Sequence, residues 1–102
     1  MKINLTQDIT NQKDSIVSKT ILKNDGGNVT LFAFDKGQAL SEHTAPFDAL
    51  FFCVDGNFSI IIGKDIHTLS SNELILLPAN IPHAVTAVIP SKCMLTMIKV
   101  NK

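Results

Sequence analysis

The chain has 102 residues, of which 45% are hydrophobic, and its nine basic side chains balance nine acidic ones. Every basic residue is a lysine, and arginine, tyrosine and tryptophan do not occur. A balanced charge excludes long-range attraction to nucleic acid or to an anionic membrane, and the missing residue types remove base stacking and bidentate phosphate recognition. We therefore expect no nucleic-acid partner and no membrane partner. A chain of this length predicts one domain, residues 1–102.

The two cysteines, Cys53 and Cys93, do not form a CxxC motif. The sequence also shows no secretory signal and no apolar stretch long enough to span a membrane. These features predict a cytoplasmic protein with two reduced thiols. A disulfide between the two cysteines stays open as an alternative, because strand pairing can bring distant positions together.

In chain order, residues Met1–Asp14 are polar and weakly patterned, which is compatible with a short helix or an edge strand. Short apolar segments follow, each closed by Gly, Asn, Asp or Pro residues that favour turns. These segments are Ile16–Leu22, Val29–Phe34, Ala49–Val54, Phe58–Ile62, Leu74–Leu77, Pro82–Ile89 and Met94–Val100. They are rich in Val, Ile, Phe and Thr and lack a helical period, so they predict an all-β sandwich or barrel.

Two of the expected strands, Ala49–Val54 and Ile60–Ile62, are apolar on both faces. The dipeptide Asp55-Gly56 between them favours a hairpin turn. In a domain of two packed sheets, one face of each strand is buried against the opposing sheet. A second apolar face must therefore be buried by something else. We expect a second subunit to bury it, and therefore a homodimer.

Three histidines are candidates for chemistry. His67 lies in the polar segment Lys64–Thr68 and is expected to be a solvated strand residue. His43 follows Gly37 by six residues, and His83 follows the rigid turn Pro78–Pro82. Only His43 and His83 therefore lie in segments with an unusual organisation.

The spacing around these two histidines resembles the motifs of the cupin superfamily. Gly37, His43 and Gly56 match the first motif, and Pro78 and His83 match the second. Together the motifs cover residues 37–87. The sequence looks like those of small single-domain bacterial cupins of uncharacterised function. This resemblance implies a cupin-type double-stranded β-helix, a jelly-roll barrel of antiparallel strands.

The sequence departs from the family pattern at several motif positions. Asn72 and Asn80 replace two glycines, and asparagine is one of the residues that tolerates left-handed backbone geometry. Ala87 occupies the position of the last residue of the second motif. Ala45 and Ala49 occupy the positions of a second histidine and a glutamate that, in metal-binding cupins, hold the ion.

The resemblance thus implies a metal site reduced to His43 and His83, which would hold iron, manganese, nickel or zinc only weakly. Strand alternation predicts that Ser41, His43 and Ala45 share one face, with Glu42 directed away. Asp48 is the one carboxylate that could orient a histidine, and its direction in a loop stays open.

If Ala49 faces the interior, Phe51 and Cys53 follow it on the same face. These residues, with Met97, are the expected walls of a ligand pocket; Val85 and Met94 are further candidates. The favoured function is a small-molecule-binding cupin of unknown ligand. The alternative is a metal-dependent enzyme, like a dioxygenase or isomerase, with a weakly held ion. A sugar epimerase is disfavoured, since its tyrosine acid and phosphate-binding arginine are missing.

Overall fold

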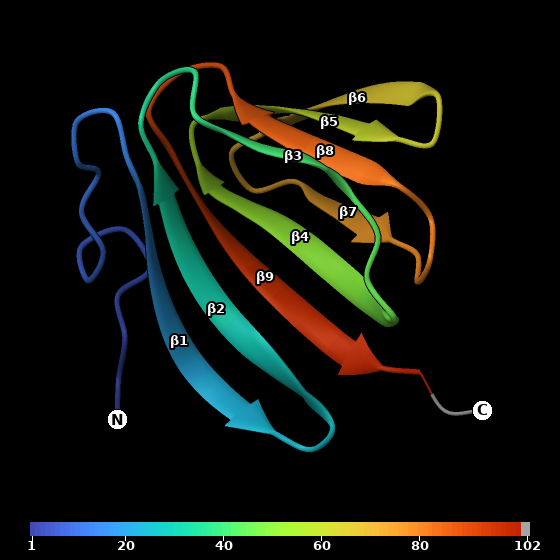
Figure 1. Cartoon of the computed structure of the whole chain (residues 1–102). Helices are drawn as coiled ribbons and strands as arrows, with labels where there is room; N and C mark the ends of the chain where they lie inside the picture. Colours follow the sequence, from blue (N-terminus) through green and yellow to red (C-terminus); the bar gives the residue numbers. More distant parts are fainter. Residues whose placement is uncertain (101–102) are drawn as a thin grey trace.

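The computed structural model describes residues 1–100 and shows two antiparallel sheets facing each other (Figure 1). The five-stranded sheet has the order β1-β2-β9-β4-β7, and the four-stranded sheet has the order β3-β8-β5-β6. The strands are β1 Ile16–Asn24, β2 Gly27–Phe34, β3 Ala39–His43, β4 Phe47–Asp55, β5 Asn57–Ile62, β6 Asp65–Ser70, β7 Leu74–Leu77, β8 His83–Ala87 and β9 Ser91–Lys99. More than half of the described residues lie in strands, which confirms the all-β prediction.

Three phenylalanine rings join the two sheets at the centre of the core. Phe34 of β2 and Phe51 of β4 come from the five-stranded sheet, and Phe58 of β5 comes from the other. Phe58 meets Phe34 and Phe51 edge to face, with ring centroids 5.3 Å and 5.0 Å apart. Such arrangements contribute about 0.5–1.5 kcal/mol beyond the burial of the rings themselves.

Two short strands lie outside the apolar segments of the sequence. β3 exposes four of its five residues, and in β6 only Leu69 is buried. Strands that leave so much surface in water need few apolar residues, and hydrophobic patterning alone does not reveal them.

Asn72 and Asn80 adopt the left-handed backbone expected at their motif positions, with φ of 71° and 65°. At Gly56, φ is 103°, and a Cβ atom would lie 2.1 Å from Ser91 Oγ. The turn between β4 and β5 therefore requires glycine for its backbone and for its close packing on β9.

The N-terminal stretch forms neither of the two expected elements. Residues 1–15 contain turns but no helix and no strand, and none of residues 1–100 forms a helix of the length and apolarity needed to cross a membrane. Its Ile9 is buried against Leu31 and Ala33 of β2. These two residues alternate with Phe32 and Phe34, which pack on the central core. The N-terminal stretch therefore covers the outer face of the five-stranded sheet beside β1 and β2 (Figure 1).

Cys53 and Cys93 are cross-strand partners on β4 and β9, and both are free thiols. The disulfide left open by the sequence required strand pairing to bring the two cysteines together. The strands do pair them, but the two thiols are not joined by a disulfide. Burial raises the pKa of Cys53 to about 11, and the negative charge of Asp55 adds to this effect. Burial also raises the pKa of Cys93, so both groups remain protonated at neutral pH.

Neighbouring isoleucines on β5 test the assignment of inner and outer faces. Ile60 is 0% exposed in the core, whereas Ile61 points outward and is 38% exposed. We expect Ile60→Ala to lower the free energy of unfolding by about 2–5 kcal/mol, because it removes buried methyl groups and leaves a cavity. Ile61→Ala is the matched control and should cost less. Urea unfolding measures both values, and equal losses would contradict the assigned faces.

Candidate functional site

His43 and His83 lie side by side at one end of the four-stranded sheet. They are directly opposite each other in the register of β3 and β8. Their ring centroids are 4.4 Å apart and the ring planes meet at 67°. His43 is exposed, whereas His83 is 9% exposed. The pair therefore combines one buried and one accessible imidazole.

A β-bulge on β3 brings His43 into this position. The register shifts between Leu40 and His43, so Leu40 pairs with Val85 while His43 pairs with His83. Val85 and His83 share one face of β8, and Leu40 packs against the core on that face. The alternation predicted from the sequence was wrong here, because the bulge places Leu40 rather than Ser41 on the inner side.

Two loops fix this end of the molecule. The amide of Asn80, in the loop before β8, donates to the Ala45 carbonyl across 2.8 Å. The amide of Ala79 donates to the Asp48 carboxylate across 2.9 Å. The direction of Asp48, left open by the sequence, is thus toward the β7–β8 loop, where it positions backbone rather than a histidine.

The hydrogen bonds of the two rings assign their tautomers. Nδ1 of His43 lies 2.7 Å from the Ser41 carbonyl oxygen, and Nδ1 of His83 lies 3.2 Å from the Ile81 carbonyl oxygen. A carbonyl oxygen only accepts, so each Nδ1 carries the proton and donates it. In the neutral rings, each Nε2 then keeps a free lone pair. The sequence could not reveal these partners because they are backbone groups, although both lie two residues before the histidine.

Burial favours the neutral form of His83. It lowers the pKa of this imidazole below its ordinary value, the hydrogen bond to the Ile81 carbonyl opposes that effect, and charge on His43 lowers the pKa further. At neutral pH His83 therefore offers an unprotonated Nε2.

The resemblance described above assigns Ala45 and Ala49 to the positions of further metal ligands. Ala49 is buried and pairs with Leu77 and with Met97, while Ala45 is partly buried in the loop held by Asn80. Within residues 1–100, no group of three or more His, Cys, Asp or Glu side chains could hold an ion together. The donor set is two neutral imidazoles, which does not fit a complete metal centre.

The expected wall residues lie at different depths. Phe51 and Cys53 are buried in the closed core, and Cys53 lies toward the β4–β5 turn, at the end away from His83. Met97 is partly buried and packs against the edge of that core. Met94, a further candidate from the sequence, lies instead on the outer face, where it packs with the N-terminal cluster.

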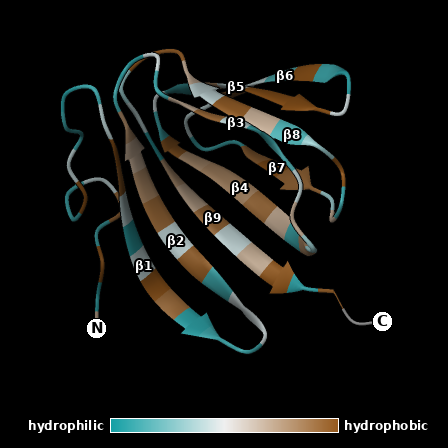
Figure 2. Ribbon diagram, in the orientation of Figure 1, coloured by the Kyte–Doolittle hydropathy of each residue, from teal (hydrophilic) through white to brown (hydrophobic). Residues whose placement is uncertain are grey.

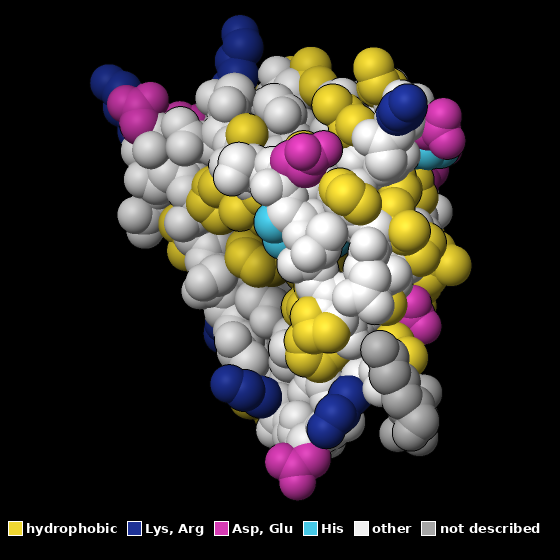
Figure 3. Space-filling model, turned by 45° about the vertical axis from the view of Figure 1, so that its right-hand side comes forward, with side chains coloured by type: hydrophobic (Ala, Val, Ile, Leu, Met, Phe, Trp, Pro, Cys, Tyr) yellow, Lys and Arg dark blue, Asp and Glu magenta, His cyan; other side chains and the backbone are white. Residues whose placement is uncertain are grey.

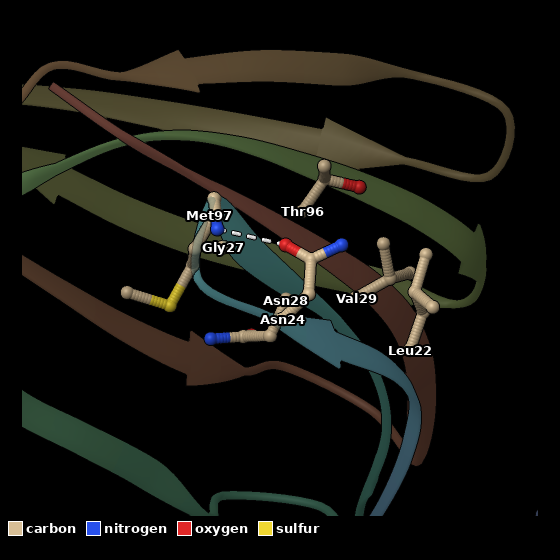
Figure 4. Close-up of a pocket in the computed structure, with 8 residues that line it drawn as sticks. Leu22, Asn24, Gly27, Asn28, Val29, Thr96 and Met97 are labelled. Carbon is tan, nitrogen blue, oxygen red and sulfur yellow. Dashed lines mark hydrogen bonds between the residues drawn. The ribbon is translucent and has the colours of Figure 1, made fainter. Parts of the chain in front are cut away.

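Two surface hollows of the structure are lined by residues other than the histidines. One, of about 240 Å³, lies at the β1–β2 turn and is lined partly by Asn24, Gly27, Asn28 and Met97 (Figure 4). The other, of about 260 Å³, is lined by Leu50, Phe52, Leu74, Met94 and Thr96. Figure 3 shows histidine atoms at the molecular surface, near hydrophobic side chains. Because His43 is exposed, the histidine pair is open to the molecular surface.

No family model and no curated protein matches the sequence. Among solved structures, a conserved protein of unknown function from Streptococcus pyogenes is 29% identical over 100% of this chain and 90% of its own, with a TM-score of 0.93. A cupin superfamily protein from Desulfitobacterium hafniense is 20% identical over 98% of this chain and 92% of its own, also with a TM-score of 0.93.

A cupin 2 conserved barrel domain protein from Leptotrichia buccalis is 35% identical over 95% of this chain, with a TM-score of 0.91. The match covers 47% of that protein, so this chain spans about half of its length. The sheet order, the motif residues and these similarities agree with one another. The chain has the cupin fold, and its neighbours in structure are small bacterial cupins of unknown function.

Proposed function

We propose that this protein binds a small molecule through Nε2 of His43 and Nε2 of His83. The observation that carries the proposal is the hydrogen bonding of both Nδ1 atoms to backbone carbonyls. Within residues 1–100, no protein donor is then assigned to either Nε2 atom of the two adjacent rings. A ligand with two hydrogen-bond donors, such as a polyol or an amide, has the complementary chemistry.

The surroundings of the pair favour a neutral ligand. The carboxylate of Asp48, near the start of β4, accepts a hydrogen bond from the Ala79 amide. Ala45 and Ala49 contribute only methyl groups, and Met97 offers an adaptable apolar surface. Within residues 1–100, the carboxylate closest in sequence to the pair is the exposed Glu42, which water screens, so donor geometry with apolar contact would determine specificity.

A weakly held transition metal is the second candidate, because two imidazole Nε2 atoms are also metal ligands. Iron, manganese, nickel or zinc would have to complete its coordination with water or with the ligand. The missing carboxylate at position 49 removes the anionic donor that would offset the charge of the ion. A metal-dependent reaction therefore ranks below simple ligand binding.

Histidine-detected NMR tests the ligand proposal. In the free protein we expect both His43 and His83 to show the Nδ1–H tautomer. Glycerol, erythritol and acetamide, added one at a time, should shift the Nε2 and Hε1 resonances of one or both. His67, exposed on β6, is the internal control and should not shift. An Nε2–H tautomer at both rings, or equal shifts at His67, would contradict the proposal.

Metal analysis separates the two candidate functions. Untagged protein dialysed without chelator should retain less than about half an equivalent of transition metal, because two neutral ligands bind weakly. Any metal that remains should be lost in His43→Ala and in His83→Ala but kept in His67→Ala. A full equivalent retained through dialysis would favour the enzyme.

The complementary experiment restores the missing ligands. Ala45→His with Ala49→Glu should strengthen zinc binding by about tenfold or more in calorimetric titration, because it adds one imidazole and one anion. The same pair of changes in a His43→Ala background is the control and should gain less. No gain in the first variant, with an unchanged far-UV spectrum, would mean that the two alanines do not lie at ligand positions.

The pH dependence of stability follows from His83. Its pKa is lowered in the folded protein, whereas the unfolded group takes up a proton near about pH 6.5. Below that pH the unfolded state binds more protons, so the free energy of unfolding falls as the pH decreases. Thermal unfolding from about pH 5 to pH 8 should show this slope. His83→Gln should reduce it, and His67→Gln should not.

A further inference from the structure

A row of four cross-strand partners crosses the inner face of the five-stranded sheet. Met97 of β9 is the partner of Asn28 on β2 and of Ala49 on β4, and Ala49 is also the partner of Leu77 on β7. Ala49 and Leu77 are buried in the central core, and Met97 packs against it. Directly opposed residues of neighbouring strands share one face, so the whole row points inward. Asn28 is the polar member of these four.

The alternation along β2 gives the same direction for Asn28. Phe34 is buried in the central core and Phe32 packs against it. Asn28 lies an even number of residues before both, so its half-buried side chain is on their face. In Figure 4, its partner Met97 is directed away from Thr96, which is on the outer side. Figure 2 shows hydrophilic colouring on β1 and β2 near their shared turn, and more hydrophobic colouring on β9.

The chain connections place Asn28 opposite the histidines. β2 continues into β3 through residues 35–38, and β8 continues into β9 through residues 88–90. The neighbours β2 and β9 of one sheet therefore face the neighbours β3 and β8 of the other (Figure 1). His43 and His83 lie at the ends of β3 and β8 away from these connections, and Asn28 is at the corresponding end of β2. Asn28 thus belongs to the opposite wall at the same end of the barrel.

Asn28 has the donors that the histidine pair needs in a partner wall. A carboxamide carries two N–H donors on its nitrogen as well as an acceptor oxygen. Asn28 Oδ1 lies 3.5 Å from the Thr30 hydroxyl, a long contact, and within residues 1–100 no acceptor is assigned to Asn28 Nδ2. The neutral rings of His43 and His83 present acceptor nitrogens on the other wall. One wall therefore accepts hydrogen bonds and the other donates them.

We propose that Asn28 determines which ligands the site takes, and that they are small primary carboxamides. This inference rests on the proposed function, because it needs a ligand at the histidine pair. The N–H groups of the carboxamide donate to Nε2 of His43 and of His83, and its carbonyl oxygen accepts from Asn28 Nδ2. Met97 and Ala49, next to Asn28 in the row, supply apolar contact for the rest of the ligand.

The rows of the two walls each end in one charged residue. Lys23 on β1 is the partner of Asn28, and Asp65 on β6 is the partner of Ile62, which is itself the partner of His83. Both charged side chains are exposed, so water and salt screen them. A carboxylate of the same shape lacks donors for the imidazoles, and an amidinium lacks an acceptor for Asn28. The neutral carboxamide satisfies both walls.

Three molecules of nearly equal shape test the inference: acetate, acetamide and acetamidinium. In titrations at neutral pH followed by the His43 and His83 resonances, the native protein should bind acetamide more tightly than either ion. Asn28→Asp replaces the donors by an anionic acceptor of the same shape. Its affinity for acetamide should fall about fivefold or more, and its preference should change to acetamidinium. Asn28→Ala should lose affinity for acetamide without gaining any for acetamidinium.

Asn24→Asp is the matched control. Asn24 is the last residue of β1, beside the same turn, and its Oδ1 accepts a hydrogen bond from the Gly26 amide across 2.8 Å. Aspartate keeps that acceptor and adds the same charge to the turn as Asn28→Asp. The order of the three affinities should stay that of the native protein.

The outcomes separate this inference from the proposed function. If acetamide shifts neither histidine of the native protein, the ligand site is wrong, and the role of Asn28 is wrong with it. If acetamide binds, but Asn28→Asp keeps the native order of affinities with an unchanged far-UV spectrum, the histidine site stands and the role of Asn28 is overturned. An equal change of order in Asn24→Asp would also overturn it, because the effect would then come from charge alone.

Discussion

Both sheets depend on the contact at Phe58, because its ring packs edge to face with Phe34 and Phe51 of the opposite layer. Face-to-face sheets pack about 10 Å apart only when side chains fill the space between them. These three rings, together with Ile60 and Val85, fill it. The spacing that they set also positions β8, and thereby His83 at its first residue. The candidate site thus lies at the start of a strand whose Val85 belongs to the same core.

The strand-length apolar segments and the motif spacing predicted the all-β architecture and the cupin fold. They succeeded where a strand has a buried face, as in β2, β4, β5 and β9. The apolar segments did not include β3 and β6, where few residues are buried, although strands were expected at His43 and His67, and they gave no element for the N-terminal stretch. Ile9 packs on the sheet through tertiary contacts with Leu31 and Ala33 and belongs to no helix or strand. The hydrophobic periodicity of the sequence therefore does not indicate its position.

For the candidate site, the sequence predicted that His43 and His83 are the retained motif residues. In the structure, the centroids of their rings are 4.4 Å apart. It predicted the alternation on β3 incorrectly, since a bulge adds one residue between Leu40 and His43. The sequence analysis also counted Met94 among the candidate pocket residues. In the structure, Cys93, Leu95 and Met97 alternate toward the core, so Met94 points to the outer face of the sheet. Composition and motif spacing do not determine the register of a strand to within one residue, and a shift of one residue moves a side chain to the other face.

The cross-strand thiols give the protein an intrinsic reporter of its own opening. Cys53 and Cys93 are enclosed and protonated in the native state, and alkylating reagents react with accessible thiolate. Modification then requires β4 and β9 to separate from their surroundings, since both cysteines lie at paired positions within the sheet. The rate at which an alkylating reagent labels these cysteines therefore follows the population of molecules in which the centre of the sheet has opened, without any added probe.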